Sequence, residues 1–113
     1  MSSNNLINQT PGLRRVEEKY PTPPAVPNLA TKVTGRNLAA LSLIISLEAE
    51  RRGVRLGVTA VFNTDGSLEG ILVHDEEQGD VLLTPGQYVV LLHDAEQASV
   101  VDESLYRHLF REA

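Results

Sequence analysis

Cysteine is absent from the 113 residues of this chain, which excludes disulfide bonds, thiolate zinc sites and cysteine nucleophiles. The N-terminus has neither a basic start nor an apolar run, so we expect no signal peptide and no secretion by that route. Aromatic residues are scarce, so the core must be built from leucine, valine and isoleucine. The apolar fraction of 42% is typical of a globular protein, and a chain of this length forms at most one domain.

Charge is divided unevenly along the chain. Residues 1–36 carry five basic and two acidic side chains, whereas residues 37–113 carry five basic and thirteen acidic ones. The N-terminal part therefore has a net charge of +3 and the remainder a net charge of −8. Because an acidic body repels phosphate backbones, we expect the body not to bind nucleic acid.

Prolines gather near the N-terminus, where residues 1–33 hold five of the six. The run Tyr20–Asn28 can form neither a helix nor a central strand, because proline lacks an amide donor and restricts the residue before it. We predict an extended, proline-rich arm over residues 1–33, with a short helical turn around Leu13–Lys19. Such an arm is either a disordered tail or a segment held by its own body or by a neighbour. The interface candidates on the arm are Leu13, Tyr20, Pro23, Val26 and Leu29.

The segment Thr34–Gly53 has the strongest helical pattern in the chain. A polar residue near its start can cap it, and Gly53 provides a left-handed stop. Its apolar run, Leu38–Leu47, is much shorter than the about 20 residues that span a bilayer, so we expect no membrane insertion. Small residues on this helix permit close approach of a second backbone, either the domain's own sheet or a helix of a second copy. These interface candidates are Ala39, Ser42 and Ser46.

Alternating apolar residues predict five strands after this helix, at residues 54–62, 68–74, 80–83, 87–93 and 98–101. Short connections between them favour an antiparallel meander. Asp102 then caps a last helix that extends to Arg111. Because several strands are apolar on both faces, the sheet needs cover from the helices, from closure into a small barrel, or from a partner. The predicted fold is α+β, with an arm over residues 1–33 and a single α+β domain over residues 34–113.

One pattern occurs twice, since residues 71–82 and 90–101 align without a gap and share the motif His-Asp-x-Glu-Gln. His74, Asp75, His93 and Asp94 could ligate a metal. On alternate strands of a meander, however, the two copies would lie about 10 Å apart. We therefore interpret them as strand ends and turns and expect neither a metal nor a cofactor. A shared pH-sensitive rim is the alternative.

Signatures of catalysis are also missing from the sequence. There is no Gly-x-Ser-x-Gly elbow and no glycine-rich phosphate loop. Four glycines after the helix are better explained as turn and bulge positions: Gly66, Gly70, Gly79 and Gly86. We expect no catalytic residues and no enzymatic activity.

The segment from Leu83 to Phe110 resembles the C-terminal part of many small proteins of tailed bacteriophages. In these a Pro-Gly or Gly-Asp turn leads to an aromatic-led strand, a tight turn, another strand, and a helix closed by aromatics. The matching positions here are Pro85, Gly86, Tyr88, Val90, Val101, Leu105 and Phe110. The resemblance implies an accessory or structural role in a phage particle and covers about a quarter of the chain.

Two functions from different classes fit these features. The first is a non-enzymatic protein–protein interaction protein, such as a virion accessory or cement-like subunit, whose basic arm contacts neighbouring subunits in an oligomer or larger assembly. It would reside in the virion or the host cytoplasm. The second is a small soluble regulatory or inhibitor protein that binds a host factor or a small ligand through its sheet face. On the first hypothesis, removing the arm should abolish assembly and leave the body folded.

Overall fold

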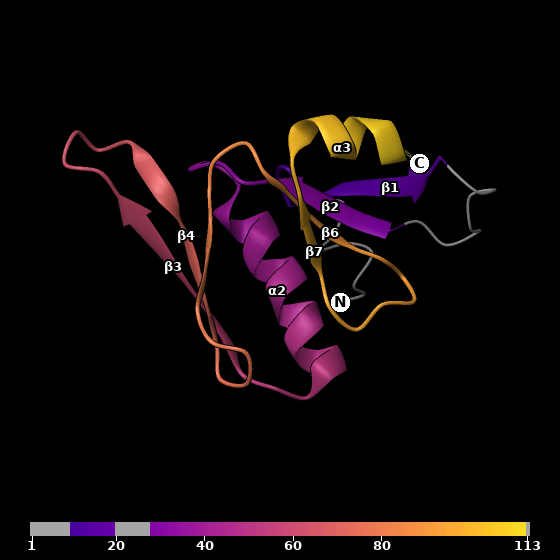
Figure 1. The fold of residues 1–113 in the computed structure, drawn as a ribbon, viewed down its shortest axis with the longest axis horizontal. Helices are drawn as coiled ribbons and strands as arrows, with labels where there is room; N and C mark the ends of the chain where they lie inside the picture. Colours follow the sequence, from indigo (N-terminus) through magenta and orange to yellow (C-terminus); the bar gives the residue numbers. More distant parts are fainter. Residues whose placement is uncertain (1–9, 20–27, 113) are drawn as a thin grey trace.

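The computed structural model describes residues 10–19 and 28–112, and confirms the α+β class (Figure 1). These residues form two helices and eight strands in two antiparallel sheets, neither of which closes into a barrel. In chain order the elements are β1 (Arg14–Glu18), β2 (Asn28–Lys32), α2 (Leu38–Arg52), β3 (Leu56–Phe62), β4 (Leu68–Asp75), β5 (Val81–Leu83), β6 (Tyr88–Leu91), β7 (Ser99–Val101), α3 (Glu103–Leu109) and β8 (Phe110–Glu112).

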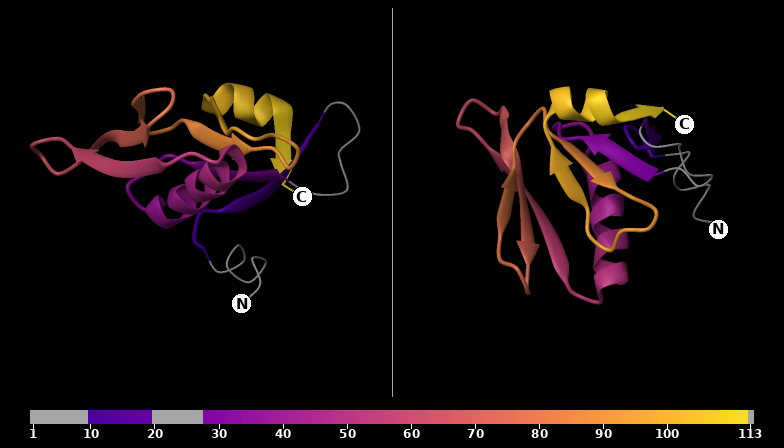
Figure 2. Two further views of the ribbon diagram at one scale, coloured as in Figure 1. Left: turned by 90° about the horizontal axis from the view of Figure 1, so that it is seen from below. Right: turned by 45° about the vertical axis from the view of Figure 1, so that its right-hand side comes forward.

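The strands divide into a five-stranded sheet, in the order β7-β6-β2-β1-β8, and a three-stranded sheet, in the order β3-β4-β5. Helix α2 contacts β3 in the smaller sheet and both β2 and β6 in the larger one. Helix α3 lies on the opposite face of the five-stranded sheet, as the views in Figures 1 and 2 show. The protein is thus a helix shared by two sheets, with a second helix outside the larger sheet.

The main core lies between α2 and the inner faces of both sheets. It contains Val33, Leu41, Ile44, Ile45, Ile71, Val73, Leu83, Val89 and Leu91. A smaller cluster lies on the outer face of the five-stranded sheet, where the rings of Tyr88 and Tyr106 stack with centroids 3.8 Å apart. Successive residues of β6 therefore serve different cores, because side chains alternate between the two faces of a strand.

Two strands lie within the segment predicted to be an arm. β2 is the central strand of the five-stranded sheet, with β6 on one side and β1 on the other. The helical turn predicted around Leu13–Lys19 is wrong, because Arg14–Glu18 is β1 and pairs with β2 and β8. Neither strand contains proline, so both can donate to their neighbours. The proline-rich residues 20–27 lie outside the described residues.

The predicted strands after α2 exist, but the five-stranded meander is wrong. β3, β4 and β5 form a meander, whereas β6 pairs with β2 and β7 rather than with β5. The chain changes sheets at the turn between β5 and β6, where Gly86 has a φ of +95° and donates its N–H to the carbonyl of Val33 at 3.1 Å. The meander was predicted because residues 28–32 were assigned to the arm. These residues form β2, which provides β6 with a hydrogen-bonding partner in place of β5.

The end of α2 and the start of α3 are as predicted from the sequence, whereas α2 begins later and α3 ends earlier than predicted. α2 stops at Gly53, which is left-handed with a φ of +67°, as predicted, although its N-cap is Asn37 and makes no side-chain capping bond. α3 begins as predicted, with the Asp102 carboxylate accepting from the backbone N–H of Leu105 at 2.7 Å. It ends before Arg111 because Phe110–Glu112 pairs with β1. Neither described helix is long and apolar enough to cross a membrane.

Candidate binding surfaces

The structure separates the interface residues predicted from the sequence into three groups. Leu13 and Leu29 are partly buried against the main core of their own chain. Three small residues of α2 are exposed to solvent: Ala39, Ser42 and Ser46. The remaining candidates lie outside the described residues: Tyr20, Pro23 and Val26. Of the candidates that the structure describes, Leu13 and Leu29 therefore contact the core, whereas the three residues of α2 face solvent.

Charges on β1 and β2 are paired with the body of the same chain. Arg14 lies 3.6 Å from Glu112, and Lys32 lies 3.6 Å from Glu103. Glu17 in turn accepts a hydrogen bond of 2.6 Å from Nε of Arg111. At these positions, charged residues of the two N-terminal strands therefore pair with residues of opposite charge in the body of the same chain.

The two copies of the repeated motif meet through their glutamines rather than their histidines. The side-chain amides of Gln78 and Gln97 exchange hydrogen bonds of 3.3 and 3.0 Å, which joins the turn before β5 to the turn before β7. His74 instead contacts Asp80, with 3.2 Å between Nδ1 and Oδ2, and His93 lies 3.1 Å from the Asn28 side chain. Among residues 10–19 and 28–112, no three histidine, aspartate or glutamate side chains gather as a metal site.

The first candidate surface is the seam, which we define as the hollow between the edge strands β5 and β7. Its volume is about 90 Å³ and it opens directly onto the main core. Among residues 10–19 and 28–112, β5 pairs only with β4 and β7 only with β6, so within this part of the chain each presents one unpaired backbone edge. The seam is lined by Ile45, Glu48, Val73, Asp75, Gln78, Val81, Leu83, Val89, Gln97, Ala98 and Val100.

Three exposed apolar side chains lie on the edge strands β5 and β7, and two of them, Val81 and Val100, line the seam. Val81, Leu82 and Val100 are exposed to 51%, 45% and 43%, and all three lie on β5 or β7. The other large exposed hydrophobic residues in the described part of the chain are Phe62, at the end of β3, and Leu105 on α3. Large apolar side chains on unpaired edges are unusual, because such edges template association with other chains.

A buried charged triad, Glu48, Arg52 and Asp75, holds one end of the seam. Nη1 of Arg52 donates to Glu48 at 2.7 Å and to Asp75 at 2.8 Å, and the three side chains are at most 8% exposed. The second Glu48 oxygen accepts from the backbone N–H of Ala98 at 2.7 Å. The triad therefore ties α2 to the last residue of β4 in one sheet and to the segment before β7 in the other.

The hydrogen bonds within the triad shift the pKa values of Asp75 and Arg52. The hydrogen bond from Arg52 lowers the pKa of Asp75 from 3.8 to about 2, assisted by backbone N–H groups of Gln78 and Glu77. The same bonds to Asp75 and Glu48 raise the pKa of Arg52. Both shifts favour the charged forms of Asp75 and Arg52, so this ion pair persists at neutral pH.

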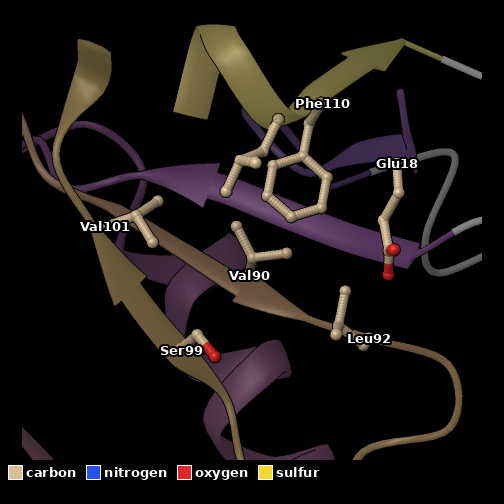
Figure 3. Close-up of a pocket in the computed structure, with 7 residues that line it drawn as sticks. Glu18, Val90, Leu92, Ser99, Val101 and Phe110 are labelled. Carbon is tan, nitrogen blue, oxygen red and sulfur yellow. The ribbon is translucent and has the colours of Figure 1, made fainter. Parts of the chain in front are cut away.

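The second candidate surface is the outer pocket, a hollow of about 260 Å³ on the outer face of the five-stranded sheet (Figure 3). It lies beside the junction of α3 and β8, where α3 ceases to cover β6 and β7. The pocket is lined by Glu18, Val90, Leu92, Ser99, Val101, Leu109 and Phe110. Glu18 supplies its charged group.

No protein-family model matches the chain, and comparisons with curated proteins and with solved structures find no match.

Proposed function

We propose that this chain is a non-enzymatic protein–protein interaction protein that binds an extended segment of another protein along the seam. The observation that supports this proposal is the position of Val81, Leu82 and Val100 on two unpaired strand edges. An extended segment adds to such an edge through main-chain hydrogen bonds, and its side chains give specificity.

The hollow of the seam gives the partner's side chains a place to bind. Val81 and Val100 line it from opposite sides, and Val73 and Val89 of the core line it as well. An aliphatic side chain of the partner that enters this hollow would remove apolar surface from water on both molecules. Burial of that kind contributes about 25 cal/mol per Å² before the costs of association are subtracted.

Charge indicates which kind of segment would bind. Five exposed carboxylates lie on the two turns that meet at the Gln78–Gln97 pair: Glu76, Glu77, Asp80, Asp94 and Glu96. A second copy of this acidic body would be repelled there, whereas lysine or arginine residues of a partner would be attracted. The proposed ligand is therefore an extended apolar segment with flanking basic residues.

Replacement of Val100 by lysine should weaken binding of such a segment at least about tenfold, because the new charge lies on the rim and repels a basic ligand. The ligand for this measurement is a synthetic peptide of alternating valine and lysine, titrated by calorimetry or fluorescence anisotropy. Leu105→Lys is the matched control, because Leu105 is also 43% exposed but lies on α3. It should leave the affinity unchanged.

Two further peptides make this test specific. A peptide with glutamate in place of lysine, and one with proline at its centre, should both bind more weakly than the basic peptide. Equal affinities of the three peptides, or equal losses in the Val100 and Leu105 variants, would contradict binding at the seam. Self-association that the Val100 variant abolishes would instead identify a second copy as the partner.

Membership of a phage particle, as an accessory or cement-like subunit, is the more specific form of this proposal. It is supported by the resemblance of residues 83–110, a segment that contains β6, β7 and α3 in that order. The partner would then be a neighbouring virion protein. A regulatory or inhibitor protein would use the same seam to bind a host factor, so identification of the bound segment distinguishes the two roles.

A further inference from the structure

We propose that the outer pocket is a second, separate binding site, and that it binds a small organic cation, namely an alkyl or aryl amine of about ten non-hydrogen atoms. The pocket and the seam lie on different faces of β7, since Ser99 and Val101 line the pocket whereas Val100 lines the seam. The two sites can therefore be tested independently.

The walls of the pocket suit the apolar part of such a ligand. Val90 lies at its centre, with Phe110 facing it from the β8 side and Leu92 and Val101 at its ends (Figure 3). At about 260 Å³ the pocket is slightly smaller than the roughly 300 Å³ at which common ligand sites begin, so the ligand must be small. A hexyl chain or one phenyl ring is of the appropriate size.

Glu18 determines the charge of the ligand. The other carboxylates of β1, β8 and α3 have basic partners: Glu17 with Arg111, Glu112 with Arg14, and Glu103 with Arg107 and Lys32. Glu18 has no such partner among residues 10–19 and 28–112, although it lies at the pocket, on the side of Leu92 (Figure 3). A carboxylate beside apolar walls is incompletely solvated, so an ammonium group placed against it compensates for the lost water.

The geometry therefore favours one orientation of the ligand. The apolar part would lie against Val90 and Phe110, and the ammonium group would contact the Glu18 carboxylate at the mouth. A neutral analogue would keep only the apolar contacts, and an anionic analogue would be repelled by Glu18. A preference for cationic over neutral and anionic ligands therefore distinguishes this site from a hollow that binds any small apolar molecule.

Hexylamine and phenethylamine should shift the NMR signals of the Val90 and Val101 methyl groups in the full chain, with dissociation constants in the millimolar range expected of ligands of this size. Hexanol and phenylpropionate should bind more weakly. Glu18→Gln should weaken binding of the amines about fivefold, as expected for a partly exposed ion pair, and should leave the affinity for hexanol unchanged. Glu69→Gln is the matched control, because Glu69 is an exposed carboxylate on β4.

A second variant tests the pocket itself. Ser99→Trp should fill the pocket and abolish amine binding, while Val100→Lys, on the other face of the same strand, should leave amine binding unchanged. The proposal is overturned if about 10 mM amine leaves the Val90 signals unshifted, or if hexanol binds as tightly as hexylamine. Contacts between Val90 and residues 20–27 in the free protein would also overturn it, because the chain itself would then fill the pocket.

Discussion

A chain that begins at Lys32 should not fold. The truncation removes all of β1 and nearly all of β2, which is the central strand of the five-stranded sheet. It removes Val16 and Ala30, which are fully buried in the smaller cluster on the outer face of this sheet, and it leaves one edge of β6 without a partner. Circular dichroism and thermal unfolding should show no cooperative transition. This result is the opposite of the one expected if residues 1–33 were a separate arm.

A chain that begins at Thr10 is the control for this truncation. It keeps every described strand, so it should unfold cooperatively within a few degrees of the full chain. A folded, cooperative fragment from Lys32 would contradict the central position of β2. It would also support the prediction that residues 1–33 are an arm separate from the folded body.

Replacement of Arg52 by methionine should lower the melting temperature by at least about 10 °C. The arginine neutralises two carboxylates, of Glu48 and Asp75, whose side chains are each 8% exposed. Without it two negative charges remain close together and largely removed from water, which is more costly than the loss of the bonds themselves. Differential scanning calorimetry measures the effect directly.

Arg55→Met is the matched control for Arg52. Arg55 is an exposed residue that follows the same helix by three positions, so its replacement removes an equal charge from the surface. We expect a change of no more than about 0.5 kcal/mol in the free energy of unfolding of that variant. Equal destabilisation by the two substitutions would show that the triad does not hold the two sheets to α2.

Stability should also fall as the pH falls from about 4 to about 2. The pKa of Asp75 is 3.8 in its unperturbed state and about 2 in the folded protein. A carboxyl with a lowered folded pKa contributes stability above its unfolded value, and that contribution is lost as the pH falls through the folded value. Asp75→Asn, which cannot titrate, should therefore flatten the pH dependence measured by urea unfolding in this range. An unchanged slope would contradict the assignment.

Local structure could be predicted from the sequence because it depends on nearby residues. The left-handed stop at Gly53, the cap at Asp102 and the hairpin turn at Asn63–Ser67 all arise from side chains within a few positions of the feature they set. Strand pairing across the chain could not be predicted in this way. β1 holds one apolar residue, Val16, among four charged ones, so its pattern does not indicate a strand.

The two candidate surfaces could not be predicted from the sequence, because both depend on strand pairing between distant parts of the chain. The seam exists because β6 pairs with β2 instead of β5, and the outer pocket exists because β8 pairs with β1 and ends α3. A partial signal was present for the triad, since Glu48 and Arg52 are four residues apart on a helix. Its third member, Asp75, was interpreted only as a turn residue and a possible metal ligand.

Amide hydrogen exchange along β5 and β7 tests the proposed function most directly. It would be measured on the full chain, with and without the basic valine and lysine peptide. The proposal predicts that bound peptide slows exchange within Val81–Leu83 and Ser99–Val101, because their unpaired backbone groups gain partners, and that the Val100→Lys variant loses this protection. Unchanged exchange on both strands at saturating peptide, or protection confined to another surface, would contradict it.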